Sequence, residues 1–233
     1  MDKVFPSVEE AVKDIPDGAT VGFTGFFTCG NPVYLTRALA KQGSKNLTIV
    51  VMQLGVGNDE INLLLENGQV KKAICNYPFY RSFSRQSLFE QLMKAGKVEC
   101  ELFPMGTFAE KLRAAGAGIP AFYTPTGAGT LLAEGKEART FNGRECLMET
   151  ALPLDYGLVH AWKADRMGNV VFRKTARNYN PDVAKAARIT IVEAENVVEP
   201  GELDPDLIHL PSVYVTRVVK VDRPKINVTI EKS

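Results

Sequence analysis

Two glycine-rich runs contain most of the residues in this sequence that could bind a small molecule. The first spans residues 17–32 and includes Gly22, Gly25 and Gly30, and the second spans residues 116–130. Because glycine has no Cβ atom, backbone amides in such runs can approach a ligand at positions that a side chain would block. Backbone amides suit an anion, a carbonyl group or a bulky cofactor, but they perform no covalent chemistry. No obvious nucleophile accompanies either run.

The histidines do not supply an alternative chemistry. The sequence has two of them, His160 and His209, and neither has neighbours spaced like metal ligands. No C-x-x-C or H-x-x-x-H pattern is present, so the sequence predicts no bound metal. His160 lies in an apolar stretch beside Trp162, where a packed, hydrogen-bonded side chain is favoured over a general base.

Other catalytic and cofactor motifs are also missing. Glu66 precedes Asn67 and Gly68 at the end of a helical pattern, which is typical of a helix C-terminal cap rather than a catalytic turn. No G-x-S-x-G pattern is present, which argues against a hydrolase triad. The glycines of the first run do not have the spacing of a dinucleotide loop, and Gln53 stands where an acidic residue would hold a ribose. A nicotinamide cofactor is therefore not expected.

A basic cluster lies further along the chain, at residues 173–178. Two interpretations remain open for it. The cluster could be a solvated surface, or Arg173 and Arg177 could grip a carboxylate with their forked guanidinium groups.

Composition places the chain among ordinary globular proteins. It has 233 residues, of which 45% are hydrophobic and 24% charged, and a net charge of +1 gives no general attraction to nucleic acid or anionic membranes. No apolar stretch is long enough to span a bilayer, and the first residues lack the apolar core of a secretory signal. The four cysteines are far apart and mostly lie in apolar segments, which predicts reduced thiols and a cytoplasmic protein.

Helical and strand patterns alternate along the chain. Strands are expected at residues 19–23, 47–51, 71–75, 98–103, 158–162, 170–172 and 189–192, with a late edge strand in 213–221. Helices are expected to begin after Ser7 and Asn31, and at residues 60–65, 87–95 and 182–187. This order predicts an α/β fold with an open, mostly parallel sheet and helices on both faces. We expect a single domain over residues 1–233, with a weakly held tail at 223–233.

With these residues in view, the chain resembles the α subunit of the family I 3-oxoacid coenzyme A transferases. The resemblance is strongest in the continuous run from Arg113 to Gly127, which reads R-A-A-G-A-G-I-P-A-F-Y-T-P-T-G. It also includes residues 17–18, 25–32, 106–110, 131–135, 161–166, 173–178 and 200–204, in order and with sensible spacing. These segments cover most of the chain.

The resemblance implies a two-subunit enzyme, with an α2β2 assembly of this chain and a β subunit. In the family, a glutamate of the β subunit is the nucleophile that attacks the acyl-CoA thioester, and a glutamyl-CoA thioester then passes CoA to a second acid. That glutamate lies in a Ser-Glu-Asn-Gly motif, which this chain lacks, so no catalytic residue is expected here. Coenzyme A would be a substrate, and no permanently bound cofactor is implied. The pocket residues expected in this chain are Thr24, Gly25, Phe26, Gly30, Gln53, Met105, Gly106 and Gly127.

Three positions depart from the family pattern. Thr24 replaces a glycine, Met52 and Gln53 replace an Asn-Asn pair, and Met105 replaces a glutamine that donates to the reacting carbonyl in the family. Methionine cannot donate a hydrogen bond. Either Gln53 supplies the lost amide, or Met105 widens an apolar acyl pocket. A chain repurposed for acyl-CoA hydrolysis or decarboxylation, or a non-catalytic scaffold, are the alternatives to transfer.

Overall fold

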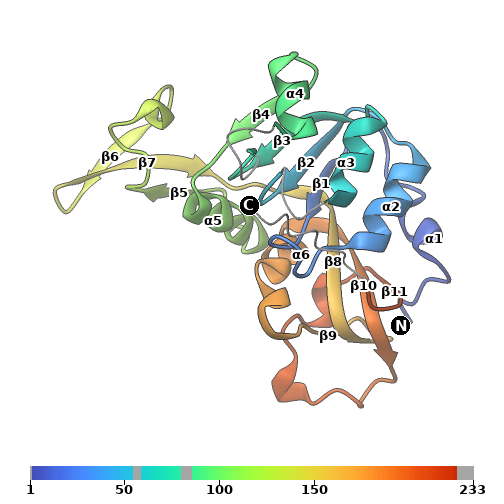
Figure 1. Ribbon diagram of the computed structural model, residues 1–233. Helices are drawn as coiled ribbons and strands as arrows, with labels where there is room; N and C mark the ends of the chain where they lie inside the picture. Colours follow the sequence, from blue (N-terminus) through green and yellow to red (C-terminus); the bar gives the residue numbers. More distant parts are fainter. Residues whose placement is uncertain (1, 55–58, 80–85, 225–233) are drawn as a thin grey trace, which may run out of the picture.

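The computed structural model describes residues 2–54, 59–79 and 86–224, and its main feature is a mostly parallel sheet (Figure 1). The strands follow one another across this sheet in the order β11-β10-β8-β1-β2-β3-β4, and β9 pairs with β8 in antiparallel fashion. Their bounds are β1 Thr20–Phe23, β2 Leu47–Val51, β3 Val70–Cys75, β4 Glu99–Leu102, β8 Leu154–Asp165, β9 Val170–Val171, β10 Ala187–Val198 and β11 Arg217–Lys220.

Helices cover both faces of the sheet, as the sequence predicts. They are α1 Val8–Val12, α2 Val33–Gln42, α3 Asp59–Glu66, α4 Leu88–Lys94, α5 Met105–Gly116 and α6 Asn180–Ala186. In β2, Ile49 and Val51 join the core that α1 to α4 cover, whereas Val50 joins the core beneath α5 and α6. Successive strand residues point to opposite faces, so a run of apolar residues in one strand serves two cores.

Local signals explain where several helices begin and end. Ser7 caps α1 by accepting a hydrogen bond from the Glu10 amide, and Ser87 forms a reciprocal capping box with Glu90 at the start of α4. Gly43 ends α2 with a φ of 91°, which is a left-handed conformation that favours glycine. Gly68, with a φ of 62°, follows the end of α3, so the predicted cap at Glu66–Gly68 is confirmed.

The order of the strands reverses direction at β1. The chain runs outward from β1 through β2 and β3 to β4, and then returns to place β8 on the other side of β1. Ligands in open α/β sheets bind at the carboxyl ends of the strands next to such a reversal. β8 and β10 are long and continue past the end of β1, since Phe23 at the end of β1 pairs with Leu158. Residues after Leu158 therefore line the space above β1.

Helix α5 and a small second sheet were not predicted. This sheet contains β5 Ala121–Thr124, β6 Ala138–Phe141 and β7 Arg144–Thr150 in the antiparallel order β5-β7-β6, and it extends away from the main sheet (Figure 1). Most of its side chains are partly or fully exposed, so its strands lack the continuous apolar runs of the main sheet.

The ends of the described chain lie close to the main sheet. Val4 forms a parallel bridge to Val218 of β11, which confirms the predicted late edge strand. Of the predicted tail, residues 225–233 lie outside the described residues. Within the described ranges, no helix is long and apolar enough to cross a membrane, and all four cysteines are free thiols.

Candidate functional site

The loop after β1 folds back on itself at the reversal point of the sheet. Phe26 and Cys29 exchange two backbone hydrogen bonds of 3.0 Å, and Phe27 between them has a φ of 51°. Thr24 at the base of the loop is fully buried, and its hydroxyl lies 3.1 Å from the Gly30 carbonyl and 3.2 Å from the Leu158 carbonyl. The Thr24 hydroxyl therefore fixes the loop to β8 rather than facing a ligand.

Two glycines of this loop are required by close packing. A Cβ on Gly25, whose φ is 107°, would fall 1.5 Å from Oδ1 of Asn31. A Cβ on Gly30 would lie 2.5 Å from the carbonyl oxygen of Ala176 and 3.0 Å from the side-chain nitrogen of Asn178. The sequence predicts that these glycines hold the loop against the acyl or pantetheine end of a ligand. The structure gives them a different neighbour, which is the protein itself.

That neighbour is the segment containing the basic cluster. Residues Lys174–Arg177 form a short 3-10 helix, η2, immediately before α6. Asn178 donates from Nδ2 to the carbonyl oxygen of Cys29 at 3.0 Å, and its own backbone has a φ of 23° and a ψ of −126°. Asn180 donates to the carbonyl of Ala176 and accepts from the backbone amide of His160. These two asparagines join the loop, η2 and β8 into one unit.

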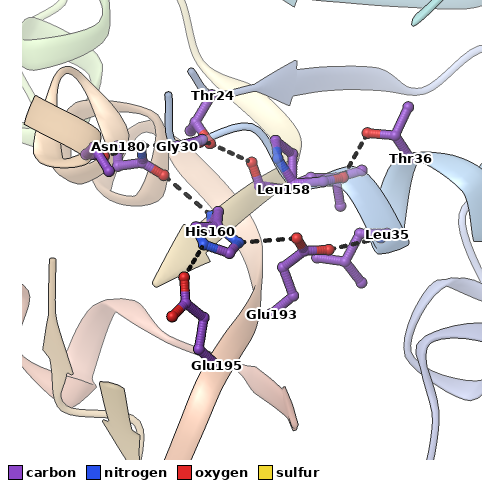
Figure 2. A network of polar contacts seen from close by, with 11 residues as sticks. Thr24, Gly30, Leu35, Thr36, Leu158, His160, Asn180, Glu193 and Glu195 are labelled. Atoms are coloured by element: carbon purple, nitrogen blue, oxygen red, sulfur yellow. Dashed lines mark hydrogen bonds and ion pairs between the residues drawn. The ribbon is translucent and has the colours of Figure 1, made fainter. Parts of the chain in front are cut away.

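His160 is buried between two carboxylates beneath this unit (Figure 2). Its Nδ1 lies 3.0 Å from Glu193, and its Nε2 lies 3.4 Å from Glu195. Glu193 is directly opposite His160 in the β8–β10 register, and Glu195 is two residues further on the same face. Glu193 is fully buried and also accepts a hydrogen bond from the Leu35 amide at the start of α2. The prediction of a packed, hydrogen-bonded His160 is confirmed.

The surroundings shift the pKa values of this pair. Burial alone would lower the pKa of His160, but the hydrogen bonds and charges of Glu193 and Glu195 outweigh it and raise the pKa overall. Burial raises the pKa of Glu193, and the contact with His160 opposes that rise. His160 thus favours its charged form inside the fold.

A cavity of about 410 Å³ opens beside His160. Its walls are loop residues 28–31, residues 173–176, His160, Glu195, Arg223 and Pro224. The cavity lies at the carboxyl edge of the sheet, above the end of β1, where the fold predicts a ligand. Within the described ranges, no cluster of His, Cys, Asp and Glu side chains could hold a metal ion.

The predicted pocket residues fall into separate places. Gly30 lines the cavity, and Thr24, Gly25 and Phe26 belong to the same loop, in which Phe26 is 47% exposed. Gly127 belongs to the turn after β5, where its neighbours are Leu132 and Leu147 of the small-sheet region. The structure therefore groups the residues of the first glycine-rich run with the cavity, but not Gly127.

Gln53 and Met105 follow β2 and β4, with β3 between them. Neighbouring strands lie about 4.8 Å apart, so the two strand ends are roughly 10 Å from each other. Gln53 is buried and its backbone pairs with Tyr77. Met105 opens α5 and is 47% exposed, and its neighbour Gly106 is exposed too. Convergence of the Gln53 and Met105 side chains on one carbonyl group stays a prediction.

Sequence reasoning did not assign Glu193, Glu195, Asn178 or Asn180 to the site. A signal for the first two was present, because carboxylates rarely occur inside an apolar strand such as I-V-E-A-E unless they are paired. The asparagines gave no such signal, since their partners on the loop lie about 150 residues earlier in the chain.

Comparison with known proteins identifies relatives along nearly the whole chain. The family model described as coenzyme A transferase matches residues 5–221. The α (A) chain of a probable succinyl-CoA:3-ketoacid coenzyme A transferase of Bacillus subtilis is 51% identical over 219 residues, covering 94% of this chain and 90% of that protein. The corresponding α (A) chain of Helicobacter pylori strain J99 is 48% identical over 96% of this chain and 94% of its own length. The human mitochondrial succinyl-CoA:3-ketoacid coenzyme A transferase 2 is 45% identical, but this chain spans only 45% of its length.

Solved structures share the fold. A variant of the decarboxylase AibA/AibB has a TM-score of 0.80 and 25% identity, covering 95% of this chain and 84% of that one. Glutaconate coenzyme A-transferase from Acidaminococcus fermentans has a TM-score of 0.81 over 94% of this chain and 76% of its own, at 22% identity. The second likeness is one of fold alone.

Proposed function

This chain belongs to the coenzyme A transferase family, and we propose that it is the α subunit of a two-subunit enzyme that moves CoA from succinyl-CoA to a 3-ketoacid. The observation that carries the proposal is the match to bacterial α (A) chains, which extends over nine-tenths or more of both partners. The cavity at the reversal point of the sheet supports it, because this edge is where such folds bind their substrates.

The nucleophile of this reaction belongs to the partner, the β subunit. A glutamate carboxylate of that partner attacks the thioester carbonyl and releases the CoA thiolate, leaving an acyl-glutamyl anhydride. The thiolate then attacks the glutamyl carbonyl and expels the original acid, which gives the glutamyl-CoA thioester. The 3-ketoacid carboxylate regenerates CoA thioester by the reverse sequence. Glu66 of this chain is no substitute for that glutamate, since it ends α3 and is followed by a structural turn.

The role of this chain is to shape the wall of the substrate site. Buried asparagines and glycines fix the loop after β1 against η2, so that wall is rigid before substrate arrives. A preformed wall places the acyl group without spending binding energy on ordering the loop. Coenzyme A acts as substrate, and no permanently bound cofactor is part of the proposal.

The assembly and compartment are also proposals. We propose an α2β2 complex, which the designation of the bacterial relatives as one of two subunits supports. A cytoplasmic location fits four free thiols in the described chain.

The test is an assay of this chain with and without its partner. The complex should exchange CoA between succinyl-CoA and acetoacetate, and this chain alone should show no turnover. Incubating the complex with succinyl-CoA and no acceptor should add the mass of CoA, less one water, to the β subunit. Turnover by this chain alone, or a complex that never carries CoA covalently, would contradict the proposal.

A second candidate is decarboxylation of an acyl-CoA. The structural likeness to the decarboxylase AibA/AibB favours it, together with Met105 in place of the family's glutamine. Release of CO2 from a carboxylated acyl-CoA, with no CoA bound to the β subunit, would favour this candidate over transfer.

A further inference from the structure

The cavity beside His160 carries positive charge that the described chain does not neutralise. Three cations line it, namely Arg173, Lys174 and Arg223, against one carboxylate, that of Glu195. Among the described residues, none of these three cations forms an ion pair, and Glu195 already faces the ring of His160. A concave site with unpaired charge of one sign attracts a ligand of the opposite sign. The ligand of this cavity is therefore expected to be an anion.

The side chain of Arg173 is held in place without its charge being satisfied. Its guanidinium group lies 5.5 Å from the centre of the Trp162 ring, and Lys163 lies 4.5 Å from the centre of the same ring. A cation over an aromatic ring keeps its N–H groups available to hydrogen-bond acceptors. The guanidinium fork matches the two oxygens of a carboxylate, which makes Arg173 suited to this anion.

The backbone at the cavity is strained where these cations emerge. Lys174 has a φ of 51°, and Asn178 at the other end of η2 has a φ of 23°. Such conformations cost about 1–3 kcal/mol each and persist where the surrounding structure over-determines them, which is common at ligand sites. Here the close contact between Gly30 and Ala176 and the bond from Asn178 to Cys29 hold η2 in this shape. The strain therefore fixes the cations around the cavity.

We propose that Arg173, assisted by Lys174, binds the free carboxylate of a dicarboxylic acyl group in this cavity. The identity of that group as succinyl rests on the proposed function. The phosphates of coenzyme A are the other source of an anion in this reaction. Three cations against one carboxylate suit one or two negative charges better than the several charges of the CoA phosphates. The volume of about 410 Å³ also falls in the lower part of the usual range for small-molecule pockets.

The proposal has a consequence for substrate discrimination. Succinate and succinyl-CoA carry a carboxylate that remains free when the other is activated, whereas acetoacetyl-CoA carries none. Arg173 would then act on the diacid side of the exchange only. Removing it should impair succinate and succinyl-CoA but leave acetoacetyl-CoA unaffected.

The test uses the complex of this chain with its β partner and compares Arg173→Gln with Lys163→Gln. Both variants remove one cation from the Trp162 ring, but only Arg173 lines the cavity. Lys174→Gln serves as a second cavity variant. Calorimetric titration measures the affinity of each complex for succinate, for butyrate and for inorganic phosphate, and rates are measured with acetoacetyl-CoA and succinate. Because Arg173 is exposed, the variant is expected to keep the thermal transition of the wild type.

Support would be a tenfold or greater loss of succinate affinity, with a matching rise in the KM for succinate, in Arg173→Gln. The KM for acetoacetyl-CoA should stay within twofold in that variant, and Lys163→Gln should stay within twofold throughout. Butyrate should bind weakly and independently of Arg173.

Several results would overturn the proposal. These are a wild-type complex that does not bind succinate, a succinate affinity that Arg173→Gln leaves unchanged, or phosphate binding that depends on Arg173 when succinate binding does not. Failure of the proposed function has a different signature. A complex that binds succinate through Arg173 but transfers no CoA would keep the carboxylate site and refute the transferase reaction.

Discussion

The loop at residues 24–31 and the turn at residues 125–130 contain glycines with nearly the same backbone conformation. The φ of Gly30 is 75°, and that of Gly129 is 72°. A Cβ on Gly30 would lie 2.5 Å from the Ala176 carbonyl, but nothing lies within 4 Å of a Cβ on Gly129. The first glycine lets two chain segments touch at the cavity, and the second only permits the chain to turn. Similar composition therefore has two physical causes in this protein.

The two regions also differ in what holds them to the rest of the fold. At the cavity, neutral amide groups of Asn178 and Asn180 bind carbonyl oxygens. In the small sheet, Glu149 of β7 is buried between Lys111 of α5 at 3.2 Å and Lys136 at 2.5 Å. A buried charge depends strongly on its partner, whereas a neutral hydrogen bond contributes about 1 kcal/mol. The two regions should therefore respond differently to single substitutions.

The largest expected effect comes from Gly30→Ala, with Gly129→Ala as the matched control. Both variants place a Cβ at a positive φ, which costs about 1–2 kcal/mol. Only Gly30→Ala also forces a clash with the Ala176 carbonyl, which adds about 1–3 kcal/mol. Urea unfolding should show the larger loss of stability in Gly30→Ala, and the complex should lose most of its turnover. Equal losses in the two variants would show that close packing at Gly30 is unimportant.

Gly25→Val is a poor probe of ligand approach for the same reason. The added side chain would collide with Asn31 inside the loop before it met any ligand. A loss of turnover in that variant would report on loop structure and not on substrate contact.

The next effect is expected from Lys111→Met in the small-sheet region. It removes one cation from the buried Glu149, and the loss of stability should be about 3 kcal/mol, near the low end for buried pairs because Lys136 remains. Arg113→Met on the same helix is the control, since its ion pair with Glu110 is exposed and should matter little. Chemical denaturation measures both. An equal, small effect of the two variants would mean that the buried charge is not required.

A smaller effect is expected from pH at the cavity. The pKa of His160 is raised in the fold above 6.5, so its protonation stabilises the folded state fully below pH 6.5, and this stabilisation is lost as pH rises through the raised pKa. The raised pKa of Glu193 acts in the same direction from about pH 4.5 upward. His160→Gln should therefore flatten the fall of unfolding free energy between about pH 6 and pH 9. An unchanged slope in the variant would assign the pH dependence to other groups.

The smallest effect on stability is expected from Met105→Gln. This residue is half-exposed at the start of α5, so the free energy of unfolding should change by less than about 0.5 kcal/mol. The preference of the complex should shift towards short 3-oxoacids, as measured by kcat/KM. If preference is unchanged while Gln53→Ala slows thioester formation by roughly tenfold to a thousandfold, Gln53 is the donor to the carbonyl instead.

The alternation of strands and helices could be predicted because its signals are local. Ser7 before an amphipathic helix and the apolar run of β2 lie within a few residues of the elements they specify. α5 was missed because attention to the glycines at residues 116–118 concealed its apolar spacing at Phe108 and Leu112. The small sheet was missed because its exposed strands carry little periodic apolar signal.

By itself, the sequence determined the fold class, the absence of a Ser-Glu-Asn-Gly motif and the glycine-rich loop after β1, since each depends on residues near one another in the chain. Only the tertiary structure decided which residues meet at the cavity. His160 faces Glu193 because β8 and β10 are neighbours in one particular register, and Gly30 touches Ala176 because the return of the chain at β8 brings η2 over the loop. Register and strand order depend on contacts across the whole sheet, and no local pattern encodes them.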